Sequence, residues 1–105
     1  MAGKSVPYED DLQGWLQDPV NAAGYLTAVL EENDADAMLV ALRDVAKAQG
    51  GMTAVAERAH IRRETLYKML SQKANPGFKG VASLLNGMGL ELAVRPIAGR
   101  QVTSA

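Results

Sequence analysis

The sequence predicts an all-α protein, a helix-turn-helix bundle of five to six helices followed by a short C-terminal strand. Apolar residues recur at helical spacing through most of the chain, as in amphipathic helices. Residues 51–70, GMTAVAERAHIRRETLYKML, contain two short helical patterns joined by a polar turn. Residues 90–94, LELAV, nearly alternate apolar with polar side chains and end shortly before Pro96, as a strand does.

Length and composition predict one domain. The chain has 105 residues, of which 48% are hydrophobic and 22% charged, as is ordinary for a globular protein. We expect a flexible arm over 1–7, a single domain over 8–96 and a flexible tail over 97–105. The absence of cysteine excludes disulfides and thiolate metal sites and fits a reducing cytoplasm. No apolar run is long enough for a membrane helix, so we expect a cytoplasmic protein without a membrane partner.

Three helices are predicted in the first half of the chain. The first covers residues 8–16 and presents one apolar face, made by Leu12, Trp15 and Leu16. The second begins at Asp18-Pro19, an N-cap followed by proline at the first helical position, and continues to about residue 32. Asn33-Asp34 ends the second helix and caps the third, over about 35–48. Gly50-Gly51 then allows a sharp turn.

The helix-turn-helix motif is predicted from the segment that follows. Its polar turn runs from Ala59 to Arg62, and its second helix covers residues 63–70. Helical spacing places three apolar side chains on one face of this helix, Leu66, Met69 and Leu70. The remaining positions then point away from the core, as a helix that enters the DNA major groove requires; they include Arg63, Glu64, Thr65 and Lys68.

A last helix is predicted over about 77–87, with an apolar side formed by Phe78, Val81, Leu84 and Leu85. The strand after it cannot satisfy its own backbone and needs a partner. A second copy of the chain across a two-fold axis, or a strand of another protein, could provide one. We therefore expect a homodimer that pairs through Leu90, Leu92 and Val94.

Charge is divided between the two halves. Residues 1–50 carry three basic and nine acidic groups, a net charge of −6. Residues 51–105 carry eight basic and three acidic groups, a net charge of +5. Opposite signs are expected if only the second half approaches phosphate, and the acidic half would suit a basic protein partner.

Side-chain chemistry assigns candidate DNA contacts to the motif. Arg63 can offer two hydrogen bonds to guanine, Glu64 can accept one from cytosine, and Thr65 can touch a thymine methyl group. Phosphate contacts are expected from residues flanking these, namely Thr53, Arg62, Tyr67, Lys68 and Lys73. Solvated surface charges are the alternative interpretation of the basic residues.

No catalytic, metal or cofactor site is predicted. The single histidine, His60, has no partner at metal-ligand spacing, and we expect it to occupy the turn. The acids Glu9, Asp10 and Asp11 are consecutive, so they point in different directions, and no nucleophile lies near them in the sequence. A solvated first helical turn explains these acids better than catalysis does.

From Gly51 to Val94 the chain resembles the helix-turn-helix antitoxins known as addiction-module antidote proteins, a branch of the lambda-repressor-like superfamily related to HigA. The resemblance is carried by Met52 and Ala56 in the scaffold helix, and by three motifs, RRETLYKML (62–70), Asn75-Pro76 with Phe78, and MGLELAV (88–94). It extends in layout to most of residues 8–95. Two positions depart from the wider superfamily. His60 stands where glycine is usual, and Arg62 replaces a capping serine.

The resemblance implies a lambda-repressor-like fold, dimerisation, binding of double-stranded DNA at the protein's own operator, and neutralisation of a RelE/ParE-like toxin. A short N-terminal helix with an aromatic residue is more than the core needs, so we expect toxin anchors at Tyr8, Leu12, Trp15 and Leu16. Two alternatives remain open. One is a prophage-type regulator without a toxin, and the other is a protein-interaction module with a vestigial helix-turn-helix.

Overall fold

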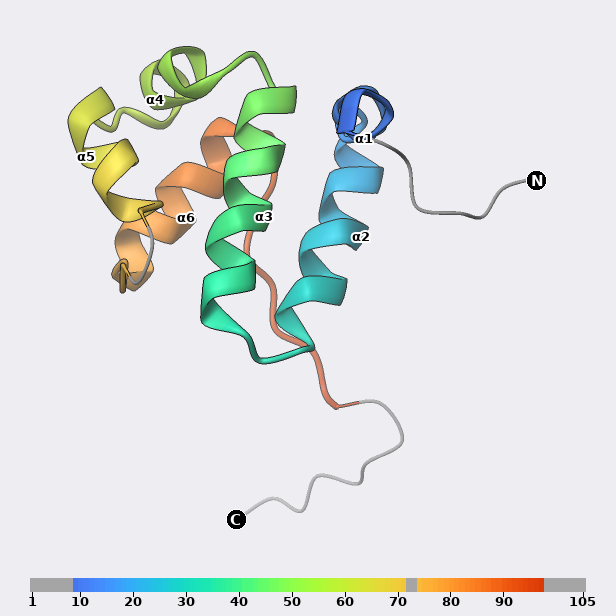
Figure 1. The fold of residues 1–105 in the computed structure, drawn as a ribbon. Helices are drawn as coiled ribbons and strands as arrows, with labels where there is room; N and C mark the ends of the chain where they lie inside the picture. Colours follow the sequence, from blue (N-terminus) through green and yellow to red (C-terminus); the bar gives the residue numbers. More distant parts are fainter. Residues whose placement is uncertain (1–8, 72–73, 98–105) are drawn as a thin grey trace.

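The computed structural model describes residues 9–71 and 74–97, and this part of the chain contains six helices (Figure 1). They are α1 (Glu9–Trp15), α2 (Pro19–Leu30), α3 (Ala35–Ala48), α4 (Met52–Ala59), α5 (Arg63–Met69) and α6 (Phe78–Gly87). The prediction of an all-helical fold is confirmed. None of these helices combines the length and apolar character needed to cross a membrane.

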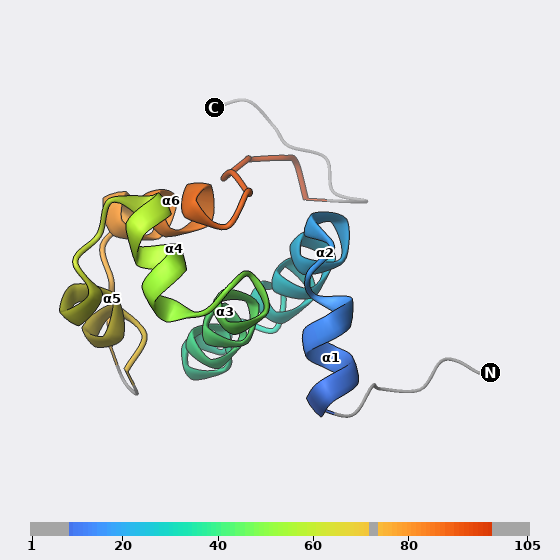
Figure 2. The ribbon, with the colours of Figure 1, turned by 90° about the horizontal axis from the view of Figure 1, so that it is seen from above.

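Helix α3 is the centre of the bundle. It contacts α1 and α2 on one side and α4 on the other, while α6 packs chiefly against α4. Seen from above, α4, α5 and α6 form one group and α1 and α2 another, with α3 between them (Figure 2). The side chains that are fully inaccessible to solvent come from α2 to α6 and from Leu16, which directly follows α1; they are Leu16, Ala22, Val45, Ala46, Val55, Leu66 and Leu84.

Both predicted aspartate caps are present. The Asp18 carboxylate accepts a hydrogen bond of 2.9 Å from the backbone nitrogen of Val20, and Pro19 occupies the first position of α2. The Asp34 carboxylate accepts one of 3.1 Å from the backbone nitrogen of Ala37 at the start of α3. Each cap satisfies an amide that the helix itself leaves without a partner.

A hydrogen bond between side chains joins α2 to α3. The Tyr25 hydroxyl donates to Oδ2 of Asp44 at 3.1 Å. Burial, the negative charge of Asp44 and this hydrogen bond together raise the pKa of Tyr25 above its ordinary value of 10.0. The associated stabilisation is complete below the unfolded-state pKa and is lost as pH rises through the higher folded-state pKa.

Helices α4 and α6 approach each other closely at Gly87. A Cβ added to Gly87 would lie 2.7 Å from Cβ of Ala59 and 2.8 Å from its backbone nitrogen. The Arg58 guanidinium reinforces the contact, because its Nε donates to the Gly87 carbonyl at 2.8 Å and a terminal nitrogen donates to the Gln49 carbonyl. Arg58 therefore ties the end of α3 and the end of α6 to α4.

The predicted C-terminal strand is not formed. Residues 90–97 follow α6 as extended chain, and no strand occurs in the described residues. A strand needs a hydrogen-bonding partner, and the described part of this single chain provides none for residues 90–94.

Helical spacing also predicts burial for Ala23 and Leu30 in α2 and for Phe78 in α6, and these three predictions are wrong. Phe78 is 78% exposed at the start of α6, and Leu30 is 59% exposed at the end of α2. Both residues lie at the end of a helix. The apolar face predicted by spacing continues to that end, but no neighbouring helix covers it there. Ala23, expected to be buried in α2, is exposed as well.

Replacing Gly87 with alanine should destabilise the protein by about 1–3 kcal/mol, because the new methyl group meets the backbone of α4. Gly24, in the middle of α2, is the matched control, since a Cβ there would meet nothing within 4 Å. Gly24→Ala should stabilise by about 0.5–1 kcal/mol, the helix propensity difference. Urea unfolding measures both, and equal effects of the two changes would contradict the close contact.

Candidate nucleic-acid interface

The turn between α4 and α5 is fixed by backbone geometry. His60 adopts the left-handed conformation, with φ of 58°, and ends α4. Its amide donates to the carbonyl of Glu57 at 3.2 Å, and the amide of Ile61 donates to that of Ala56 at 2.9 Å. This pair of hydrogen bonds is the Schellman motif, usually made with glycine at the left-handed position. Histidine therefore occupies the turn, as expected from the sequence.

The inner face of α5 is anchored in the core. Leu66 is fully buried, Leu70 is 1% exposed, and Met69 packs partly buried against them. These are the three apolar positions expected from the sequence. Seven residues are too few for a helix to be stable alone in water, so tertiary contacts hold α5 in place.

The outer face of α5 is exposed. All three base-reading candidates and three of the phosphate-binding candidates are exposed here: Arg63, Glu64 and Thr65, and Arg62, Tyr67 and Lys68. Arg62 precedes the helix at its N-cap position and makes no side-chain capping bond. The Arg62 side chain therefore caps none of the first amides of α5. This absence is expected where arginine replaces a capping serine.

Arg63 and Tyr67 interact on this face. The guanidinium carbon of Arg63 lies 5.5 Å from the centre of the Tyr67 ring, within the range of a cation–π contact. The two residues are one helical turn apart and, with Glu64, Lys68 and Ser71, line a shallow depression. Stacking on the ring restricts the arginine fork to fewer rotamers and leaves its nitrogen atoms available.

The C-terminal end of α5 is held by α3. The Arg43 guanidinium donates to the carbonyl of Leu70, across 27 positions of the sequence. A cation at a helix C-terminus also interacts favourably with the helix dipole. The Ser71 hydroxyl donates to the carbonyl of Lys68 at 2.8 Å. These bonds give α5 a fixed direction relative to α3.

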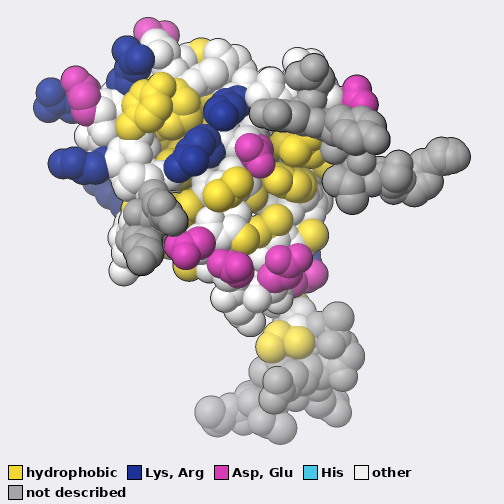
Figure 3. All heavy atoms as spheres, in the orientation of Figure 1, with side chains coloured by type: hydrophobic (Ala, Val, Ile, Leu, Met, Phe, Trp, Pro, Cys, Tyr) yellow, Lys and Arg dark blue, Asp and Glu magenta, His cyan; other side chains and the backbone are white. Residues whose placement is uncertain are grey.

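Charge on the surface follows the division seen in the sequence. In Figure 3, Lys and Arg side chains gather over α5 and the adjoining parts of α3 and α4, and acidic side chains lie along the lower edge, where α2 connects to α3. Four exposed acids belong to that connection and the start of α3: Glu31, Glu32, Asp34 and Asp36. The basic and acidic faces are thus on different parts of the molecule.

The other predicted site residues are dispersed. Thr53 is exposed on the first turn of α4, beside the basic face, whereas Lys73 lies outside the described residues. In the C-terminal segment Leu90 is half-buried, Leu92 is 45% exposed and Val94 is 99% exposed.

The expected toxin anchors divide between the core and the surface. Leu16 is fully buried, and its backbone carbonyl accepts a hydrogen bond of 3.0 Å from Gln49, so it is a core residue and not an exposed anchor. Leu12 is half-buried and Trp15 is 44% exposed. Tyr8 lies outside the described residues. Helical spacing predicts that Leu16 and Trp15 share one face. In the structure Leu16 is buried in the bundle, whereas Trp15 remains partly exposed.

Two positioning arginines were missed by sequence reasoning. Arg43 and Arg58 hold α5 and α6 by hydrogen bonds to backbone carbonyls, and no local sequence signal marks such distant acceptors. Within the described residues no group of three or more His, Cys, Asp or Glu side chains could hold a metal ion.

Comparison with known proteins identifies relatives of the chain. A family model described as "Probable addiction module antidote protein" matches residues 8–96. A protein of Haemophilus influenzae, described as an uncharacterized protein, is 38% identical over 71 residues, which are 68% of this chain and 72% of the relative. No solved structure matches the chain.

Replacing His60 with valine should destabilise the protein by about 1–3 kcal/mol, because a β-branched residue is strained in the left-handed conformation. His60→Asn is the control, since asparagine tolerates that conformation, and its stability should stay close to the original. Thermal unfolding of both variants checks this. Equal losses in the two variants would show that contacts of the histidine ring, and not the backbone conformation, are important.

Proposed function

Because the chain belongs to the family of probable addiction module antidote proteins, we propose that it is the antitoxin of a type II toxin–antitoxin pair and the repressor of its own operon. It acts in the cytoplasm by binding, without a catalytic step. One surface occupies the operator DNA and blocks the promoter, and another binds and neutralises the toxin. The fold proposed for this activity is lambda-repressor-like.

The exposed face of α5 is the observation that supports DNA binding. On the apolar side, Leu66 and Leu70 are buried in the core. The polar side therefore faces outward in a fixed orientation. We assign α5 to the major groove, where Arg63 reads guanine through O6 and N7. Glu64 and Thr65 are placed to read neighbouring bases, and Tyr67 aligns Arg63 by the cation–π contact.

Phosphate contacts surround this reading surface. We assign them to Thr53 at the start of α4, to Arg62, Tyr67 and Lys68 at α5, and to Lys73, which follows α5 in the sequence. Such contacts set the position of the protein on the duplex and supply affinity on any sequence. The net charge of +5 on residues 51–105 favours approach to phosphate, while the acidic half stays away from it.

The repressor is proposed to act as a homodimer. Residues 90–94 are extended and have exposed apolar side chains at Leu92 and Val94, although they form no strand in the single chain. Pairing with the same segment of a second copy would complete an antiparallel ladder. A two-fold dimer would present two recognition helices about 34 Å apart, one turn of DNA.

The toxin is proposed to be a small RelE/ParE-like protein. An antidote family implies a toxin partner. The net charge of −6 on residues 1–50 would attract a basic protein and accelerate the encounter.

Arg63→Ala should weaken binding to the operator by about 1–3 kcal/mol and relax the preference at one base pair, because it removes a bidentate base contact. The measurement is fluorescence anisotropy with DNA from upstream of the operon and with variants of each base pair. Arg95→Ala is the matched control. Arg95 faces Glu31 at 3.5 Å in an exposed ion pair far from α5 in sequence, and its loss should change little. Unchanged affinity in Arg63→Ala would remove α5 from the readout.

Lys68→Ala should lower affinity by a similar factor on operator and unrelated DNA. Neutralising one phosphate contact also reduces the slope of log affinity against log salt by about one. Titrations at several salt concentrations measure this slope. A loss confined to the operator sequence would assign Lys68 to base reading instead.

Leu92→Pro should abolish dimer formation and cooperative operator binding, because proline removes a backbone donor from the proposed ladder. Helical content should be retained, since residue 92 follows the last helix. Light scattering coupled to sizing gives the mass, and circular dichroism gives the helix content. A variant that remains dimeric would show that the copies associate through another surface.

A further inference from the structure

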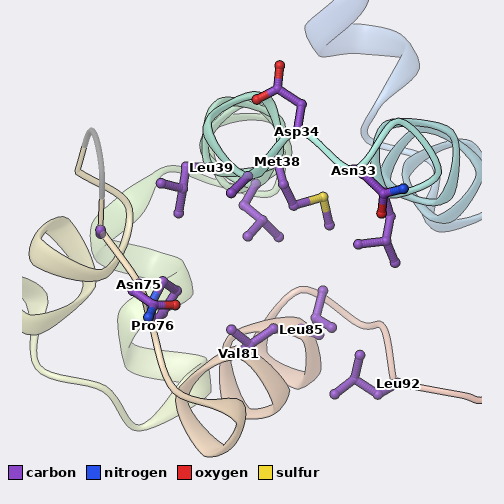
Figure 4. Close-up of a pocket in the computed structure, with 13 residues that line it drawn as sticks. Asn33, Asp34, Met38, Leu39, Asn75, Pro76, Val81, Leu85 and Leu92 are labelled. Atoms are coloured by element: carbon purple, nitrogen blue, oxygen red, sulfur yellow. The ribbon is translucent and has the colours of Figure 1, made fainter.

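An open apolar groove lies between α3 and α6, apart from the proposed DNA-binding face. It has a volume of about 430 Å³, and its walls include Leu30, Met38, Pro76, Val81, Leu85 and Leu92. We call it the α3–α6 groove. In Figure 4, Met38 and Leu39 of α3 face Val81 and Leu85 of α6 across the opening, with Pro76 at one end and Leu92 at the other.

Part of the groove wall is exposed to solvent, although Leu39, Leu42 and Leu85 are buried. Leu30 is 59% exposed and Leu92 is 45% exposed, while Met38 and Val81 are half-buried. A second hollow of about 380 Å³ adjoins the groove and shares four of its residues, Leu30, Met38, Leu85 and Leu92. A continuous apolar surface of this kind marks an interaction site.

Acidic side chains surround one end of the groove. Glu31, Glu32, Asp34 and Asp36 are all exposed in the turn between α2 and α3 and in the first turn of α3. The Asp34 carboxylate caps α3 and points away from the apolar walls, as Figure 4 shows. One basic residue, Arg95, faces this group, at 3.5 Å from Glu31. The local charge is therefore negative outside an apolar interior.

We propose that the α3–α6 groove is the toxin-binding site, and that it takes an apolar side chain from a cationic protein surface. The proposal rests on the antitoxin function proposed above. The apolar walls would bury the anchor of the toxin, and the acidic rim would attract its basic face. The lining is mainly apolar, with Asn33, Asp34 and Asn75 as its polar members, and the Asp34 carboxylate points away from the apolar walls. A small-molecule site usually has polar groups that converge on the ligand.

This location separates the two activities. The acids lie along the edge opposite the basic face of α4 and α5 in Figure 3. A toxin bound at the groove would leave α5 free, and its positive charge would meet the acids and not the DNA-binding arginines. The same chain could then hold toxin and operator together.

The test of the apolar walls compares two exposed residues of the same helix. Leu30 lines the groove, whereas Val20, 78% exposed at the other end of α2, does not. The probe is the protein encoded next to this chain in its operon, titrated by calorimetry. Leu30→Gln should weaken binding about tenfold or more, since a central apolar anchor contributes at that level. Val20→Gln should change it less than about twofold, as an exposed residue outside an interface does.

The role of the acidic rim is tested by the same charge reversal at two acidic residues, one on the rim and one remote from it. Glu32→Lys should slow association several-fold at low salt, and the difference should vanish at high salt. Glu57→Lys, on α4, should have a small effect, because Glu57 is remote from the groove. Unfolding curves of every variant establish that it folds.

Four results would overturn the proposal. If Leu30→Gln and Val20→Gln bind equally well, or if Trp15→Ala on α1 abolishes binding while Leu30→Gln does not, the antitoxin function stands and the groove is not its site. If Leu30→Gln converts a dimer to a monomer and leaves toxin affinity unchanged, the groove is an interface between copies. If the original chain does not bind the neighbouring product, the antitoxin function itself fails.

Discussion

The contact between α4 and α6 is the constraint on which the arrangement of α4 and α5 depends. At Gly87 the two helices approach so closely that a methyl group has no room against Ala59. Arg58 fixes the same junction by bonding to the carbonyls of Gly87 and Gln49. Because α4 is held in this way, the left-handed turn at His60 determines the direction of α5 relative to α4. Leu66, Leu70 and Arg43 then fix the remaining rotation of that short helix.

The elements with local signals could be predicted from the sequence. Asp18-Pro19 and Asp34 are cap signals that operate within three residues, and both caps form where expected. The turn at His60 was also located correctly, because the polar stretch between two apolar patterns leaves few positions for it. Apolar spacing likewise identified the buried face of α5.

The wrong or missed predictions concern features that depend on which groups lie opposite a residue in the folded chain. Spacing places Leu30 and Phe78 on apolar faces, but it does not show whether another helix covers the end of that face. Alternation over residues 90–94 describes a segment able to form a strand, and the ladder needs a partner that the described chain lacks. Arg43 and Arg58 act on carbonyls 27 and 29 positions away, so their roles become visible only in the folded chain.

The opposite net charges of the two halves of the sequence correspond to different surfaces of the structure. Acidic groups gather at the α2–α3 connection, and basic groups gather over α5 and the adjoining parts of α3 and α4, so that the chain presents two electrostatically different surfaces (Figure 3). Under the proposed function, the basic surface faces DNA and the acidic rim faces a cationic toxin. Binding at one surface need not obstruct the other.

The most direct test is the ratio of the affinities of the unmodified chain for its own upstream region and for a shuffled sequence of the same length, at physiological salt. A repressor that reads bases through α5 should prefer its operator by about a thousandfold or more. A ratio near one, with affinity that falls equally on both sequences as salt rises, would contradict the account. The exposed charges of α5 would then be an ordinary solvated surface.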